Sequence, residues 1–177
     1  YRFGSPIGNV FYVNSATGTN SAGFGHSPEA PFASLAYAFS SDRCTANNDD
    51  YIIIAPGHTE TVDAASDIAA DIAGVTVIGL GSGSNRPLFT FATDTAATIA
   101  ISAADITFSN LQVKTTKDEL VSMFVVSAAN VTIDRVDYVD NTTNQAIQFL
   151  LTTAAADYLT VKNLFHWKGT AAAATEK

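Results

Sequence analysis

The chain has 177 residues, enough for one domain with a real core, and its net charge of −8 leaves it without the basic patch that nucleic-acid phosphates require. No run approaches the ~18 apolar residues of a membrane span, and the single cysteine, Cys44, excludes an internal disulfide. Hydrophobic residues make up 47% of the chain and charged residues only 15%, so we expect another subunit or a larger assembly to cover part of the surface.

The N-terminal part predicts an arm, a strand, a long loop and a helix. Residues 1–9 contain glycine and proline without periodicity, which predicts an extended arm. A short strand is expected at 10–13, and a loop rich in Ser, Thr, Gly and Asn follows it as far as Pro31. Apolar residues then recur with helical spacing, which predicts a capping α-helix near residues 32–41.

Beyond residue 50 the chain predicts short strands and then a tail. The continuous apolar run at 51–55 is typical of a buried strand, which Pro56 and Gly57 end. Another strand is expected at 87–91. The low-complexity segment 169–177 predicts an extended C-terminal tail, or one that docks on a neighbouring molecule.

Four stretches of the chain can be superimposed on a shared threonine. The threonines are Thr76, Thr107, Thr132 and Thr160, at spacings of 31, 25 and 28 residues. A repeated unit of roughly 20–30 residues that carries its own strand is typical of a solenoid.

Within each repeat the alternation of apolar residues shifts by one position, which predicts a corner between two strands. The second corner residue is Gly79, Asn110, Arg135 or Asn163. Gly and Asn adopt left-handed backbone angles at low cost, whereas Arg135 would be strained in that conformation.

A further strand precedes each of the last three repeats, at 97–102, 122–127 and 146–152. Short links of small residues ending in Asp105, Asn130 and Asp157 follow these strands, and we interpret the Asx side chains as turn-forming rather than as a cation-binding ladder. The prediction is an all-β, single-stranded right-handed parallel β-helix of about five to six short coils over residues 10–168.

Three N-terminal segments carry a family resemblance: 11–20, 25–35 and 50–58. They resemble the first coil of right-handed parallel β-helix proteins of the pectate-lyase-like superfold, where a strand, a Ser-Pro-x-x-Pro-Phe type of turn, a capping helix and a strand ending in Pro-Gly begin the solenoid. The small size and the Ala/Thr-rich coils resemble the short β-helix proteins of tailed bacteriophages. Some of those are capsid decoration or cement proteins, and others are tailspikes.

Enzymes on such a fold cut acidic polysaccharides by Ca²⁺-dependent lyase chemistry or with paired carboxylates. In stacked repeats Asp134 has Ser109 and Lys162 as neighbours, and Asp137 likewise has no acidic neighbour. We therefore expect Asp134, Asp137 and Asp140 to be solvated outward side chains, with a catalytic role as the alternative. No catalytic residue is assigned.

Histidine and acidic residues do not predict a metal or cofactor site. The histidines lie far apart in sequence, at His26, His58 and His166. Three acidic residues, Asp42, Asp49 and Asp50, could form a weak Ca²⁺ site, but a solvated loop is the favoured interpretation. His58 is expected to form hydrogen bonds within a turn.

Aromatic residues gather near the C-terminus, and we take Tyr138, Phe165 and Trp167 as a candidate subunit interface. If Leu164 points into the core, Phe165 and Trp167 point outward, because neighbouring residues of a strand alternate. Exposed aromatic side chains also serve as sugar-stacking platforms, which remains the alternative.

The function expected is that of a non-enzymatic virion protein, a capsid decoration or cement protein on the outer surface of a phage head. Its expected partners are the major capsid protein and further copies of itself, with a homotrimer as the expected oligomer, and neither nucleic acid nor membrane. The alternative is a tailspike-like β-helix that binds or degrades host polysaccharide. A non-catalytic carbohydrate-binding module is a third hypothesis, which an exposed Trp167 would favour.

Overall fold

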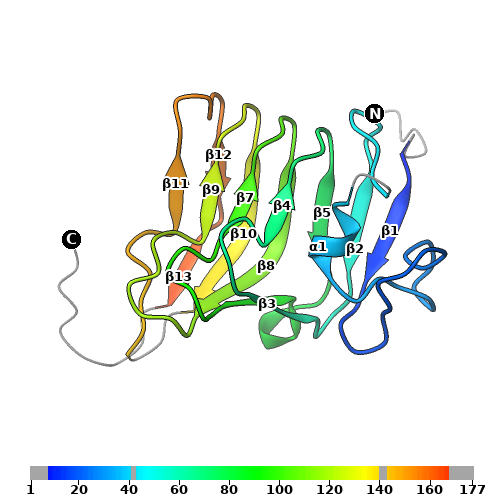
Figure 1. Cartoon of the computed structure of the whole chain (residues 1–177), viewed down its shortest axis with the longest axis horizontal. Helices are drawn as coiled ribbons and strands as arrows, with labels where there is room; N and C mark the ends of the chain where they lie inside the picture. The colour runs from blue at the N-terminus through cyan, green and yellow to red at the C-terminus, as the bar shows by residue number, and fades with distance from the viewer. Residues whose placement is uncertain (1–7, 41–42, 140–142, 168–177) are drawn as a thin grey trace.

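The computed structural model describes residues 8–40, 43–139 and 143–167. They form a parallel β-solenoid of about four turns, called coils below (Figure 1). The strands are β1 (Val10–Val13), β2 (Tyr51–Ile54), β3 (Thr59–Val62), β4 (Ile68–Ala70), β5 (Thr76–Gly79), β6 (Leu88–Phe91), β7 (Ile99–Ile101), β8 (Thr107–Thr115), β9 (Phe124–Val126), β10 (Thr132–Val139), β11 (Leu150–Thr152), β12 (Thr160–Lys162) and β13 (Phe165–Trp167). The helical elements are α1 (Leu35–Ala38) and the 3₁₀ turn η1 (Gly83–Asn85).

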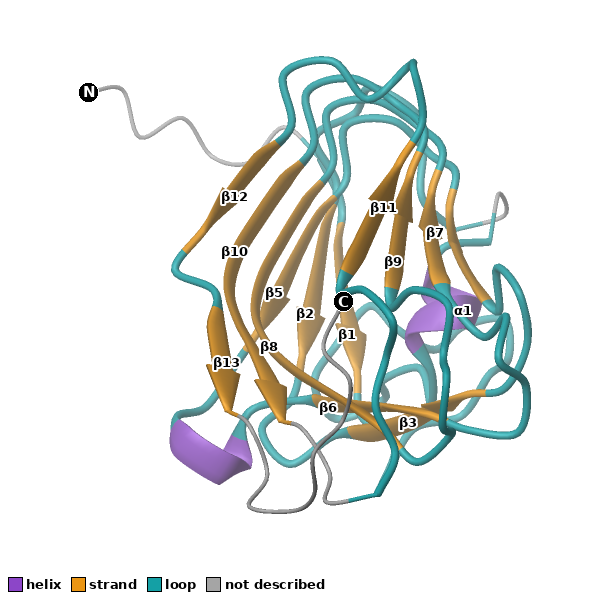
Figure 2. Cartoon of the chain, turned by 90° about the vertical axis from the view of Figure 1, so that its left-hand side faces the viewer, coloured by secondary structure: helices purple, strands orange, loops and turns teal. Residues whose placement is uncertain are grey.

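The strands stack into walls around a common interior, as the end-on view shows (Figure 2). One wall is the four-stranded sheet β11-β9-β7-β4. The second is the row β1-β2-β5-β8-β10-β12, and the third contains β3, β6, β13 and the C-terminal halves of β8 and β10. The pairings between named strands within the described residues are parallel, which confirms the solenoid predicted from the repeats.

The register follows the sequence repeats. The four aligned threonines pair with one another in neighbouring strands, and the residue after each threonine points inward. Those inward residues continue a buried column that runs Phe11, Ile52, Val77, Phe108 and Ile133, with at most 1% of each side chain exposed. Each fully buried apolar side chain of this column contributes about 1.5–3 kcal/mol. The column is therefore a main source of the stability of the fold.

The corners agree with the prediction at three of the four positions. Asn110, Arg135 and Asn163 have positive φ angles of 62°, 53° and 52°. Gly79 does not adopt positive φ. Glycine is required there because a Cβ atom would collide with the carbonyl oxygen of Asn110, so close approach of two backbones is the reason rather than backbone conformation.

The turns before the threonine strands require one correction. Gly74, Asp105 and Asn130 are left-handed, with φ of 79°, 59° and 57°. In the last repeat the left-handed residue is Tyr158, with φ of 55°, and not Asp157. Asp157 lies three residues before its threonine instead of two, because the last link is longer.

The helix lies within the predicted range 32–41 but is shorter. It covers only Leu35–Ala38, and its start is set by the Ser34 side chain, which accepts from the Tyr37 N–H at 3.2 Å. It contacts β1, β2 and β4, so in the first coil it takes the place that a strand of the four-stranded sheet takes in later coils. The strand-built coils therefore number about four rather than five to six.

The N-terminal end of the solenoid is closed by the loop between β1 and α1. The outer edge of β1 bonds to this loop: Tyr12 N–H donates to Gly25, Phe32 N–H to Tyr12, and Asn14 N–H to Phe32, each at 2.8 Å. Most of the arm expected at 1–9 and all of the tail at 169–177 lie outside the described residues. Among the described residues, no helix is long and apolar enough to cross a membrane.

Candidate functional site

Exposed apolar side chains gather at the C-terminal end of the solenoid. Nine large hydrophobic residues of the described chain are exposed, and only Leu80 and Val121 lie outside residues 143–167. The other seven are Ile147, Leu151, Tyr158, Val161, Leu164, Phe165 and Trp167. We call residues 143–167 the terminal coil, and this clustering makes it the candidate functional site.

Several of these side chains occupy core positions of the repeat. Val161 pairs with Ile133 and continues its inward column, yet Val161 is 38% exposed where Ile133 is 1% exposed. Leu150 likewise follows the fully buried Phe124 and is only partly buried. Within the described residues no further coil lies on top of them, so the terminal coil presents a cross-section of the hydrophobic core.

The two aromatic residues of β13 lie on the outer side of the terminal coil. Phe165 pairs with the outward Asp137, and Trp167 pairs with Val139. Their rings meet edge to face with centroids 6.3 Å apart, and they are 54% and 65% exposed. Phe165 pairs with Asp137, so Leu164 lies one residue before it as the buried Val136 lies before Asp137. Leu164 therefore takes the inward position and Phe165 the outward one, as predicted from the sequence.

Tyr138 does not belong to this exposed surface. Its side chain is only 5% exposed, its ring stacks on His166 at 4.4 Å, and its hydroxyl accepts from the Ala146 N–H at 3.1 Å. Of the three residues taken as a subunit interface, Phe165 and Trp167 are available for contact, and Tyr138 supports the terminal coil from beneath.

The backbone of the terminal coil also has an open edge. β11 pairs with β9, and β12 and β13 pair with β10. Within the described part of the chain, no strand pairs with their opposite edges. N–H and C=O groups on such an edge are a ready pairing site for another chain.

The carboxylates on β10 were expected to be solvated, and instead they are bonded to neighbouring side chains. Asp134 accepts from Asn163 Nδ2 at 2.8 Å, and Asp137 forms an ion pair with Arg86. Burial lowers the pKa of the Arg86 guanidinium. Register also confirms the predicted neighbours, Ser109 and Lys162 for Asp134. Asp140 lies outside the described residues.

His58 is fully buried and holds the first coil together. Its Nδ1 accepts from the Ser15 N–H at 3.0 Å, and its Nε2 lies 3.1 Å from Glu60 Oε2. The Glu60 carboxylate also accepts from the N–H groups of Leu35 and Ala36 at 2.7 and 3.2 Å. This arrangement joins the loop, β3 and α1, which agrees with the hydrogen-bonding role predicted for His58.

Asp50 is also fully buried and has a structural role. Its oxygens accept from the N–H groups of Asn9 and Thr45, each at 2.7 Å, and from Asn48 Nδ2 at 2.8 Å. These donors engage both oxygens of the carboxylate, which supports a role in holding the loop. Asp42, another residue of the possible Ca²⁺ site, lies outside the described residues. No cluster of three or more metal-ligating side chains occurs among the described residues.

Searches among known proteins returned no matching family, curated protein or solved structure. The site therefore rests on its own geometry. Sequence reasoning identified Phe165 and Trp167 but missed Ile147, Leu151 and Val161. The signal for Val161 was present, since it is the inward residue of the last aligned repeat.

Proposed function

We propose that this protein is a non-enzymatic structural component of a virion, and that it acts by binding other proteins through its terminal coil. The observation that carries the proposal is the concentration of seven exposed large apolar side chains on that one coil. Monomeric soluble proteins rarely leave a contiguous apolar patch uncovered unless it serves an interaction.

The specific setting we propose is the outer surface of a phage head, where the chain would act as a capsid decoration or cement protein. Its resemblance to short phage β-helix proteins supports this setting, and the rigid stacked core supports a role that depends on binding energy rather than on catalysis. Its partners would be the major capsid protein and further copies of the chain itself.

The test is to count copies on purified particles of the virus that encodes the chain, by quantitative mass spectrometry. A decoration protein is expected in fixed proportion to the major capsid protein, whereas a spike protein occurs in a few copies at the tail. Absence from the particles would contradict the proposal.

Binding to heads can be tested with two matched variants. Leu164→Lys places a charge on the terminal coil, and Leu80→Lys places the same charge on a residue of nearly equal exposure elsewhere, 43% against 42%. If the terminal coil binds the capsid, only Leu164→Lys weakens attachment to heads that lack the protein.

A second candidate function is glycan binding, which the exposed edge-to-face pair of Phe165 and Trp167 favours. The engagement of Asp134 by Asn163 and of Asp137 by Arg86 supports binding without cleavage. Release of reducing ends from acidic polysaccharides would instead support a tailspike-like enzyme. Calorimetric titration with such polysaccharides, with Trp167→Ala as the variant, distinguishes glycan binding from protein binding.

A further inference from the structure

We propose that the terminal coil is a self-complementary surface that joins two copies of this chain end to end. The proposal rests on the proposed function, in which this coil binds protein, and it names the partner as a second copy.

The exposed surface of the terminal coil is a section through the hydrophobic core. In the viewing direction of Figure 2 the terminal coil faces the reader, with β11, β12 and β13 forming the end of the solenoid. Val161 and Leu150 continue columns that are buried in the earlier strands of their walls, and Leu164 is 42% exposed beside them in sequence. A surface that is a section through a core is best covered by a similar section, because its side chains already have the spacing of stacked strands.

The two ends of the solenoid differ in how their edge strands are covered. At the N-terminal end, the outer edge of β1 is already bonded to the chain's own loop through Tyr12 and Asn14. Head-to-tail stacking would have to displace that loop. Within the described residues, no strand pairs with the outer edges of β11, β12 and β13, so the favoured contact is between two terminal coils.

Two terminal coils would meet with two-fold symmetry. A contact between identical surfaces is isologous and has a two-fold axis, so it closes after two copies and does not grow into a fibre. An axis that crosses a strand at right angles makes the paired edge strands antiparallel, which is a favourable backbone pairing. The homotrimer expected from sequence would need a different contact, along the side of the solenoid.

The charge of the terminal coil also favours contact between two copies. The chain carries a net charge of −8, but the terminal coil contains one acidic residue, Asp157, and one basic residue, Lys162. Two copies can therefore meet here without the repulsion expected between their acidic sides.

Light scattering coupled to size exclusion tests the proposal on the full chain over a range of concentrations. The expected mass is twice the 18.5 kDa of the chain. Leu164→Lys should raise the dissociation constant at least tenfold, while Leu80→Lys should leave it unchanged. A monomer at all concentrations, a trimer, or equal effects of the two variants would overturn the proposal.

Hydrogen exchange on the unmodified chain provides a test that does not depend on variants. The edge amides of β12 and β13 should exchange slowly at concentrations where dimers form and at least tenfold faster on dilution, while β1 exchanges at the same rate in both. Protection that does not change with concentration would mean that another part of the chain covers this edge, and pairing would be wrong.

The two levels of the proposal fail separately. A monomer that binds heads through the terminal coil would overturn the pairing and leave the proposed function in place. If Leu164→Lys breaks a dimer but the protein is absent from virions, the pairing stands and the proposed function is wrong.

Discussion

His58 and Glu60 form a buried hydrogen-bonded pair, with His58 Nε2 3.1 Å from Glu60 Oε2, and this pair fixes the geometry of the first coil. Because Nδ1 accepts from the Ser15 N–H, the ring must carry its proton on Nε2. Glu60 then accepts from that proton and from the first N–H groups of α1. The imidazole thus holds the loop at Ser15 directly and α1 through Glu60.

Removing this imidazole should destabilise the fold. His58→Ala leaves the Ser15 N–H and part of the Glu60 carboxylate without a partner, and we expect a loss of about 2–3 kcal/mol in the free energy of unfolding. Urea denaturation measures it. The matched control is His26→Ala, because His26 is exposed and loses only a ring contact with Phe11, 5.3 Å between centroids, so it should change stability by less than about 1 kcal/mol. Similar losses in the two variants would contradict the role of His58.

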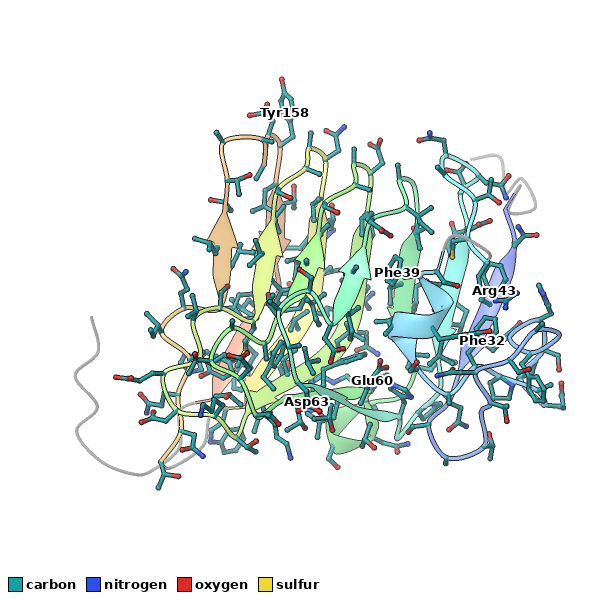
Figure 3. The ribbon with its side chains drawn as sticks, in the orientation of Figure 1. Phe32, Phe39, Arg43, Glu60, Asp63 and Tyr158 are labelled. Atoms are coloured by element: carbon teal, nitrogen blue, oxygen red, sulfur yellow. The ribbon has the colours of Figure 1, made fainter. Side chains whose placement is uncertain are left out.

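Tyr158 should be a site where substitution stabilises the protein. It is 84% exposed, points away from the coil (Figure 3) and has φ of 55°. Tyr158→Asn keeps the turn and relieves backbone strain, so we expect a gain of about 0.5–1 kcal/mol. Tyr158→Ala removes the same ring but keeps the strain, and should give no gain in thermal unfolding. Equal gains would assign the effect to the ring instead.

One column of the core should show how burial ends at the terminal coil. Val77 and Val161 occupy the same inward column, with 0% and 38% exposure. We expect Val77→Ala to cost about 2 kcal/mol and Val161→Ala less than about 1 kcal/mol in dilute solution. If two copies pair, the cost of Val161→Ala in unfolding experiments should rise with protein concentration. A cost at Val161 equal to that at Val77 in dilute solution would contradict the exposed position.

Cys44 should make the fold less stable at alkaline pH. Burial, with a smaller contribution from the Asp50 carboxylate, raises the pKa of its thiol from 9.0 to about 12. The unfolded chain therefore releases this proton at lower pH than the folded chain, and stability present below pH 9 is lost as pH rises towards 12. Cys44→Ala should reduce the slope of unfolding free energy against pH in that range, whereas parallel curves for the two proteins would contradict it.

The architecture could be read from the sequence because a solenoid repeats its own constraints. Each threonine strand and each corner occurs several times, so pattern errors average out, and the pairing of Thr107 with Thr132 follows from alignment alone. The same reasoning predicted that Asp134 faces Ser109 and Lys162. The register of a stacked solenoid follows from a pattern that each repeat carries, so a single sequence is enough to predict it.

The remaining features depend on contacts that occur only once. The start of α1 is set by Ser34 and by a carboxylate, Glu60, which is distant in sequence. Gly79 is required by the approach of Asn110, a residue of the next coil. These contacts occur once each, so the repeat pattern of the sequence could not predict them.

The parallel register has a consequence for the evolution and engineering of the chain. Since neighbouring coils meet mainly through matched columns, we expect the chain to accept an extra repeat of the length between Thr107 and Thr132, with loss of the Arg86–Asp137 ion pair that spans these strands. The distance between the N-terminal loop and the terminal coil would then grow in steps of about 4.8 Å. The number of repeats would therefore set the distance between the two ends of the protein.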